Sequence, residues 1–269
     1  MIRNVILSLL ISLPLIGWAQ RGHSFSTGVG ISYYYGDLTD GFQNIYVRPA
    51  GQISYGYYFT PAISLRFGLT YSQLGAADSL SNGEGRRKRN LHFRSPITEV
   101  SILGRYEFLP DSKFGLYYQN KAHFTPYVFG GVSIFTFDPR ARRDGEWVRL
   151  QPLGTEGQFI PGGEYEDPYS LLQIAIPVGG GISYRFDNNL SIDLDIGYRF
   201  TFTDFLDDVS DAYPDIEELR AAGGDLAVSM SDPSGGAALG APRGNPALKD
   251  GYVFAIVSFS YFLDFEGKK

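Results

Sequence analysis

Residues 189 to 208 constrain the fold of this chain more than any other feature. The stretch reads NLSIDLDIGYRFTFTDFLDD, and from Leu190 to Phe202 apolar residues alternate with polar ones. Because successive side chains of a strand point to opposite faces, the alternation predicts a strand with one apolar and one polar face. It is also long, since strands of globular proteins usually have about 5–6 residues.

The same alternation recurs along the chain and predicts eight strands. The fifth is apolar on both sides, so its outer face stays open. A composition of 33 Gly, 20 Phe, 19 Tyr and no Cys favours an all-β protein without disulfides or thiolate metal sites. The predicted strands lie near residues 25–35, 53–59, 63–71, 92–108, 124–137, 174–186, 190–202 and 253–265.

The connections between these strands alternate in length. FTPA (59–62) and DNN (187–189) are tight turns, whereas the connections after strands one, three, five and seven are long, the last running from about 204 to 250. Long outer loops with short periplasmic turns are typical of outer-membrane barrels. The exception is residues 109–123, which are longer than a periplasmic turn requires.

The polar faces decide between two kinds of barrel. A soluble lipocalin-like barrel would turn its apolar side chains inward, but its surface would carry more Lys and Glu than these faces do. We therefore predict an eight-stranded antiparallel transmembrane β-barrel of the outer-membrane type, with long extracellular loops, apolar faces toward lipid and a packed polar interior. Arg199 is expected to pair with Asp193, Asp195 or a neighbouring acid. The predicted charge network inside the barrel comprises Arg66, Glu99, Arg105, Glu107, Arg185, Asp193, Asp195 and Arg199.

The two ends of the chain fit this prediction. Residues 1–19 carry Arg3, an apolar run and then small residues, which predicts a signal peptide followed by a barrel domain over 20–269. The alternative is a membrane-anchoring helix, which Pro14 disfavours. Residues 253–265 alternate aromatic and apolar residues, as barrels inserted into the outer membrane do. The expected location is the outer membrane of a Gram-negative bacterium.

Five segments carry a family resemblance: RNLHFRSPITEVSILGRYEF (89–108), FTPYVFGGVSIFTFDPRA (124–141), LLQIAIPVGGGISYRF (171–186), TFTDFLDDVSDAYPD (201–215) and DGYVFAIVSFSYF (250–262). In them the chain resembles a Bacteroidetes family of outer-membrane barrels that includes PorG, a component of the type IX secretion system. The resemblance implies a structural component that ties the outer membrane to periplasmic parts of that machine. It implies no catalytic residues.

One strongly basic run, EGRRKRN (84–90), lies in the loop after the third strand. Arg86, Arg87, Lys88 and Arg89 are candidates for contact with lipopolysaccharide phosphates or an acidic partner, because arginine forks chelate phosphate oxygens. The alternative is a solvated loop tip, or charges paired with the acidic last loop. A net charge of −6 argues against nucleic acid as a partner.

The last long loop is acidic. Its carboxylates could bind calcium, but their spacing does not match an EF-hand loop. The alternative is that Asp215 caps a short helix, with Glu218 completing a capping box and Gly223 ending it. We therefore predict no metal and no cofactor. The acidic residues are Asp204, Asp207, Asp208, Asp211, Asp215, Glu217 and Glu218.

No catalytic arrangement emerges from the sequence. His23, His92 and His123 fall near strand ends without a flanking nucleophile. The chain is therefore predicted not to be an enzyme; the alternative is a stand-alone barrel that binds or modifies lipid. Tyr117 and Tyr118, in the periplasmic connection 109–123, are either contacts for a periplasmic secretion partner or part of an aromatic girdle at the lipid headgroups.

Overall fold

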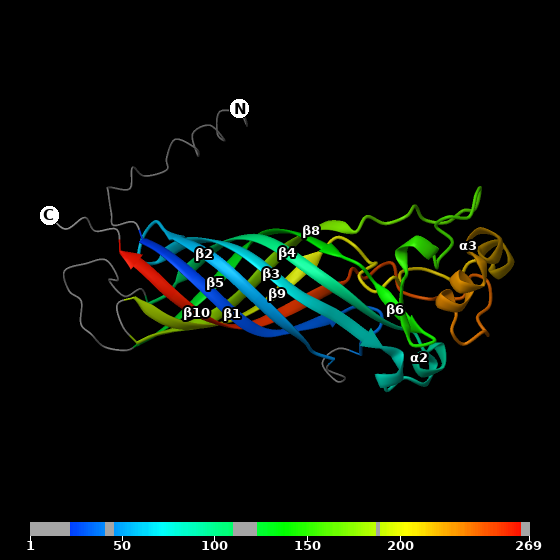
Figure 1. Cartoon of the computed structure of the whole chain (residues 1–269), viewed down its shortest axis with the longest axis horizontal. Coiled ribbons are helices and arrows are strands. Elements are labelled where there is room, and N and C mark those ends of the chain that lie inside the picture. The colour runs from blue at the N-terminus through cyan, green and yellow to red at the C-terminus, as the bar shows by residue number, and fades with distance from the viewer. Residues whose placement is uncertain (1–21, 41–45, 110–122, 187–188, 265–269) are drawn as a thin grey trace, which may run out of the picture.

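The computed structural model describes residues 22–40, 46–109, 123–186 and 189–264. In this part of the chain eight long antiparallel strands form a closed barrel, in which each strand pairs with its neighbours in the sequence and β1 pairs with β10. Figure 1 shows the barrel lying along the long axis of the molecule. The strands are β1 (Gly22–Tyr35), β2 (Arg48–Tyr58), β3 (Ile63–Ala77), β4 (His92–Glu107), β5 (His123–Phe137), β8 (Leu172–Arg185), β9 (Leu190–Thr201) and β10 (Gly251–Asp264).

All eight predicted strands, and the closed antiparallel barrel, are confirmed. The structure also decides the orientation of the fifth strand, β5, which the sequence left open. Phe124 and Val132 are exposed on its outer side, whereas Tyr127 and Phe129 are buried inside the barrel. Bulky side chains on the inner face explain the glycines of the adjacent strand β8: a Cβ on Gly181 would lie 2.5 Å from the Tyr127 ring.

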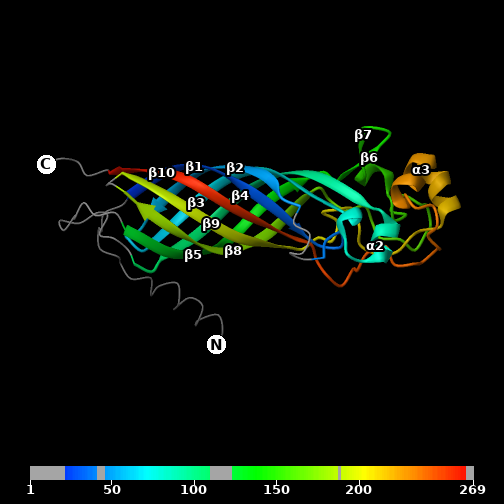
Figure 2. The ribbon, with the colours of Figure 1, turned by 90° about the horizontal axis from the view of Figure 1, so that it is seen from below.

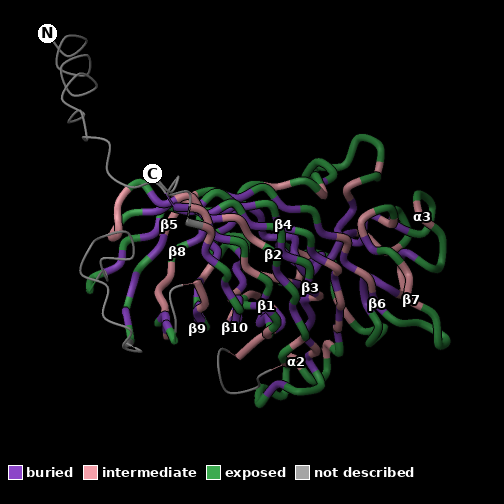
Figure 3. The backbone as a smooth tube through the Cα atoms, turned by 60° about the vertical axis from the view of Figure 1, so that its left-hand side comes forward, coloured by how far each residue is buried: buried purple, intermediate pink, exposed green. Residues whose placement is uncertain are grey.

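The outer surface of the barrel is apolar along every strand. Strand β9 alternates exposed and buried residues from Ile192 to Phe200, with the apolar ones exposed, and the tube in Figure 3 shows the same alternation of green and purple. Such a surface is shielded from water only where an apolar environment, such as lipid chains, covers it. Its members include Phe25, Val29, Ile31, Ile53, Phe67, Leu69, Tyr71, Val100, Ile102, Val128, Val132, Ile174, Val178, Ile182, Leu194, Ile196, Val257 and Phe259.

The four long connections gather at one end of the barrel, which we call the cap end (Figures 1 and 2). The opposite end, where β1 begins and β10 ends, is the turn end. The cap contains the hairpin β6 (Arg140–Arg143) and β7 (Glu146–Arg149), which joins the barrel through the pairing of Arg140 with Arg94 of β4. It also contains η2 (Asp78–Leu80), η3 (Gln151–Leu153), α2 (Glu84–Arg89) and α3 (Ile216–Ser231).

The first part of helix α3 begins and ends where the sequence predicts. Asp215 accepts hydrogen bonds from the backbone amides of Glu217 and Glu218, which is an N-cap. The backbone is not helical at Gly224, with a φ of 73°, so the first helical stretch ends at Gly223, and a second stretch that the sequence did not predict follows to Ser231. Among the described residues, no helix is both long and apolar enough to span a membrane.

The main hydrophobic core fills the cap half of the barrel. Side chains near the cap ends of the strands, such as Tyr34, Phe93 and Tyr252, pack there against Phe205 and Leu206 of the last connection. Residues 203–210, which we call the plug, are buried throughout. The last connection therefore closes this end of the barrel from within.

The exposed apolar band generates a prediction about its surroundings. Val29, in the middle of β1, is 73% exposed, and Leu248 in the cap is 63% exposed. If lipid covers the band, Val29→Arg should lower the free energy of unfolding in lipid bilayers by about 2–4 kcal/mol, because a charge would face the membrane centre. Leu248→Arg is the matched control and should change it little. Urea titration in vesicles measures both, and equal effects would argue that water, not lipid, faces the band.

Candidate functional site

The predicted charge network lies inside the barrel, and all eight of its residues are buried. Toward the turn end, Arg66 Nη1 lies 2.6 Å from Asp195 Oδ2, and the Tyr127 hydroxyl donates to Asp195 Oδ1 over 2.6 Å. Arg105 Nη2 lies 3.4 Å from Asp193 Oδ1 and 3.2 Å from Glu107 Oε1. Each acid is thus matched to an arginine across or along the interior.

Arg199 pairs with a neighbouring acid, one of the predicted alternatives. Arg199 does not pair with Asp193 or Asp195; its Nε and Nη2 donate to the two carboxylate oxygens of Glu99, both over 3.2 Å. The Tyr252 hydroxyl also donates to Glu99, over 2.8 Å. The reason is the position of these residues along the barrel axis. Asp193 and Asp195 lie nearer the turn end than Arg199 does, and there they contact Arg105 and Arg66.

Aromatic side chains occupy the space between these ion pairs. The Arg105 guanidinium lies 3.5 Å from the centre of the Tyr127 ring, and that of Arg185 lies 4.1 Å from the Phe262 ring. Leu103, Tyr127 and Phe129 form a separate buried cluster in the interior. Side chains therefore fill the barrel, as expected for eight strands.

A second buried network lies in the cap, and the sequence analysis did not find it. The Tyr34 hydroxyl donates to Asp207 Oδ2 over 2.6 Å and lies 2.8 Å from Asp250 Oδ1. Asp250 also accepts the backbone amide of Leu206, and Asp207 accepts that of Val209. These two carboxyl groups hold the plug to the end of β1 and the start of β10.

The neighbouring carboxylates Asp208 and Glu156 fix the plug from the other side. Asp208 accepts the hydroxyl groups of Thr155 and Tyr169, each over 2.5 Å. Glu156 accepts the backbone amide of Ser210 over 2.9 Å and forms an ion pair with Arg243 at 2.8 Å. Residues from the third and fourth long connections are thereby joined around one buried guanidinium.

Burial changes the protonation of the plug carboxyls. It raises the pKa of Asp204 to about 7 and that of Asp208 to about 6, the latter against the opposing charge of Arg243. The pKa values of Asp207 and Asp250 are also raised well above the usual range, chiefly by burial. Protonation of one of these two carboxyls avoids placing two like charges around the single Tyr34 hydroxyl.

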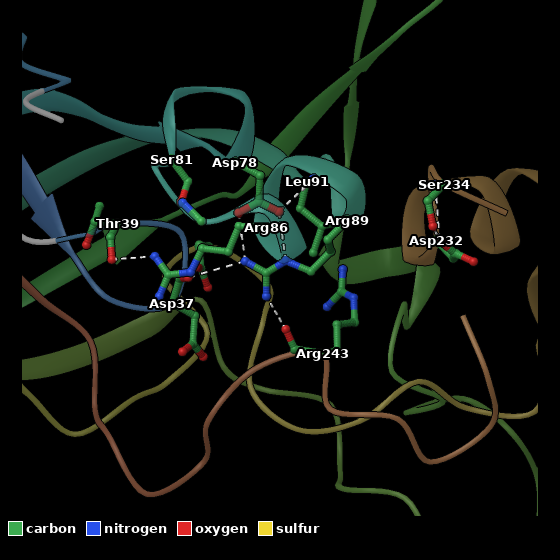
Figure 4. Close-up of polar contacts among 12 residues, drawn as sticks. Asp37, Thr39, Asp78, Ser81, Arg86, Arg89, Leu91, Asp232, Ser234 and Arg243 are labelled. Atoms are coloured by element: carbon green, nitrogen blue, oxygen red, sulfur yellow. Dashed lines mark hydrogen bonds and ion pairs between the residues drawn. The ribbon is translucent and has the colours of Figure 1, made fainter. Parts of the chain in front are cut away.

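The basic run forms helix α2, and its arginines are engaged within the cap (Figure 4). Arg89 donates from Nε and Nη2 to the two oxygens of Asp78, over 2.7 and 2.8 Å, and also bonds the Arg243 carbonyl oxygen. Arg86 pairs with Asp40 at 2.7 Å. The carboxylate partners of these two arginines come from the first two long loops, so the alternative that the acidic last loop supplies them is wrong. Lys88 pairs with Glu84 on the helix itself.

A cavity of about 420 Å³ opens between the hairpin, α3 and the plug. Its polar lining includes His92, Asp207, Asp232 and Arg243. These groups are already used: His92 Nε2 accepts the backbone amide of Arg142, and Asp232 accepts the amides of Ser234 and Ala237. In the same lining the Ser234 hydroxyl donates to Asp232 Oδ1 over 2.5 Å, to the carboxylate that already accepts those two backbone amides.

The remaining predicted sites are located as follows. His23 bonds the Tyr55 hydroxyl at the turn end of the barrel. Tyr117 and Tyr118, the segment 110–122, the predicted signal peptide and the side chain of His123 lie outside the described residues. Within the described residues, the carboxylates of the last loop form no group of three or more with His, Cys, Asp or Glu that could hold a metal ion.

The Arg199–Glu99 pair gives a stability prediction. Arg199→Leu would leave Glu99 charged and buried, so the free energy of unfolding should fall by about 3–5 kcal/mol. Arg87→Leu, in the exposed part of α2, should change it by less than about 0.5 kcal/mol. Adding Glu99→Gln to Arg199→Leu should recover most of the loss, since the neutral amide still accepts from Tyr252. Denaturant titration in detergent tests this; a double variant no more stable than Arg199→Leu alone would contradict it.

The plug carboxyls give a pH prediction. Because the folded-state pKa of Asp204 is raised from 3.8 to about 7, the folded chain binds more protons than the unfolded chain between these values. The stability of the plug should therefore fall as pH rises from about 5 to about 7 and then level off. Hydrogen exchange of the amides of residues 203–210, read as free energies of opening, measures this. Asp204→Asn should reduce the slope of this profile, with the part due to Asp208 remaining, whereas Asp144→Asn, at a position 92% exposed, should leave it unchanged.

Comparison with solved structures returns small bacterial outer-membrane proteins of low sequence identity. They include the N-terminal β-barrel domain of Pseudomonas aeruginosa OprF (10% identity, 91% of this chain and 98% of that chain, TM-score 0.37) and Ail of Yersinia pestis (9%, 91% and 99%, 0.43). A major outer membrane protein of Thermus thermophilus is similar (15%, 90% and 99%, 0.40). Similarity at this level says nothing about function, and the barrel rests on the strand pairing described above.

Comparison with sequence families gives a firmer result. No curated protein matches the chain. A family described as "Domain of unknown function (DUF6089)" matches residues 3–226, which is well over half of the 269 residues. The chain therefore belongs to the DUF6089 family.

Proposed function

We propose that this protein is a non-conducting barrel of the Gram-negative outer membrane that acts as a structural or anchoring component of a protein-secretion envelope complex. The resemblance to the family that includes PorG makes the type IX secretion system the expected complex. Under this proposal the partners are outer-membrane lipid and periplasmic secretion proteins, and the protein performs no catalysis.

The observation that carries the proposal is the closed interior. Ion pairs and aromatic rings fill the turn half of the barrel, and the core and plug fill the cap half. Such a barrel offers no path for a solute. What remains available to a partner is the outside of the molecule: the cap, the lipid-facing wall and the connections at the turn end.

A second candidate function is a stand-alone barrel that binds or modifies lipid. The 420 Å³ cavity of the cap favours it, because a cavity of this size is large enough for a small ligand. Its polar groups, however, are hydrogen-bonded within the cap. We therefore keep enzymatic activity as the alternative.

Membrane location and pore closure can be tested together. The protein should fractionate with the outer membrane and migrate faster on detergent gels unheated than boiled, because a closed barrel resists detergent. Reconstituted in vesicles, it should not raise the uptake of small sugars above that of empty vesicles. Recovery as a soluble periplasmic protein, or sugar uptake similar to that of a porin, would contradict the proposal.

An anchoring role requires that the periplasmic side of the barrel bind periplasmic secretion components. Shortening residues 111–120, predicted to lie there, should abolish co-purification with periplasmic secretion components while the gel shift on heating is kept. Lys88→Ala, whose side chain is 75% exposed in the cap, is the control and should spare the complex. If the cap variant breaks the complex and the shortened connection does not, the predicted orientation or the anchoring role is wrong.

A further inference from the structure

A group of arginines lies on the outer face of the barrel where the hairpin β6–β7 joins β4. Arg94 points outward, on the exposed parity of β4, and Arg140 pairs with it across the ladder. Arg140 pairs in turn with Arg149, and Arg142 with Trp147. Because paired and alternate residues of a ladder share a face, these side chains lie together on one surface.

A fifth arginine approaches this group from the first residue of β2, Arg48, which has the inward parity of Ala50 and Gln52 and is half-buried at the end of the strand. The Arg48 guanidinium lies 4.2 Å from the centre of the Tyr46 ring. That ring rests on the outer face of β3, since a Cβ on Gly75 would lie 3.0 Å from it, and Gly75 pairs with Arg94. Arg48, Arg140 and Arg142 are all close enough to Arg94 to repel its charge. We call Arg48, Arg94, Arg140, Arg142 and Arg149, with Trp147, the arginine face.

The arginine face has fewer carboxylate partners than the arginines of the barrel interior and of α2. Among the described residues, its ion pairs are those of Asp138 with Arg140 and Arg149. The Arg94 guanidinium is held against the Trp147 ring, 3.7 Å from its centre, and within the described part of the chain this side chain makes no hydrogen bond or ion pair. Its Nε is buried and unsatisfied, as is that of Arg48. These Nε donors are therefore oriented but unused.

The height of the arginine face indicates what it meets. Tyr71, 60% exposed, is the last strongly exposed apolar residue of β3, and Gly75 beside Arg94 lies four residues further. Four residues span about 13 Å of strand, or about 10 Å along the membrane normal at a tilt of about 40°. This is the level of lipid headgroups, where Trp and Tyr are enriched.

We propose that the arginine face binds the phosphate groups of an outer-leaflet lipid headgroup, with Arg94 as the principal donor. Arginine forks match phosphate oxygens in a bidentate manner, and a phosphate would relieve the repulsion among the clustered guanidinium groups. The site opens toward the lipid side of the wall, so the phosphate arrives on a membrane lipid. This places the headgroup contact away from α2, whose Arg86 and Arg89 already have carboxylate partners.

Trp147 supplies a reporter within the site. The chain has two tryptophans, Trp18 and Trp147, and Trp18 lies in the predicted signal peptide, so a barrel prepared from residues 20–269 carries Trp147 alone. This barrel is refolded in a maltoside detergent, whose headgroup carries no phosphate, and titrated with diphosphorylated lipid A or its dephosphorylated analogue. Only the phosphorylated lipid should change the tryptophan emission saturably. Arg94→Gln should weaken that binding about tenfold or more, as expected when a charged hydrogen-bonded contact is lost.

Matched variants separate the outcomes. Arg87→Gln and Lys88→Gln remove charges from α2 and should leave the affinity unchanged; a loss of binding in these variants would overturn the proposal. So would equal binding of the dephosphorylated lipid, or saturation by inorganic phosphate at millimolar concentration, which would indicate a site for free anions. If Arg94→Gln fails the heat-shift test of folding, Arg142→Gln, exposed on the same face, replaces it and should weaken binding severalfold.

Discussion

The structure depends on how a narrow barrel accommodates charge in its interior. An eight-stranded barrel has just enough room for side chains, and a charge left there without a partner costs several kcal/mol. The chain meets this constraint with pairs: Arg66 with Asp195, Arg105 with Asp193 and Glu107, and Arg199 with Glu99. Because the Arg66–Asp195, Arg105–Asp193 and Arg199–Glu99 pairs join strands far apart in the sequence, forming them requires the strands to be in register.

In the cap, beyond the ends of the strands, buried charges are likewise matched to partners. Four connections that would be separate loops are joined by buried carboxylates, which bind backbone amides and hydroxyl groups of other connections. Glu156 and Arg243 are separated by 87 residues in the chain but lie 2.8 Å apart. The result is a folded unit with its own hairpin and helices, which closes the barrel and keeps the plug in place.

Two groups of arginines in this protein therefore differ in whether carboxylates neutralise them. Those of the interior and of α2 described above are largely neutralised by carboxylates, so they stabilise the fold. Those of the arginine face are oriented by Trp147 and Tyr46 but have one carboxylate, Asp138, among the described residues. The basic run of α2 is easier to recognise in the sequence than the arginines of the arginine face. The fold, however, leaves the arginines of the arginine face available to a ligand.

The sequence by itself determined the barrel. Alternation with a period of two places apolar and polar residues on opposite faces whatever the partner strand is, so the strands, their order and the buried positions of Glu99 and Arg199 could be read locally. The N-cap at Asp215 was predictable for the same reason, since it depends on the next three residues.

Only the tertiary structure decided which charges meet. The choice of Glu99 as the partner of Arg199 depends on the relative height of strands separated by 100 residues in the chain. The raised pKa values of the plug carboxyls depend on burial by loops from elsewhere, which turned an acidic segment into part of the core. The arginine face likewise combines β2, β4, β6 and β7; β6 carries a short basic run, RARR, but only the pairing of β6 with β4 and β7 brings its arginines beside Arg94 and Trp147. Local patterns specify faces; contacts between faces arise from the closure of the barrel and the packing of its cap.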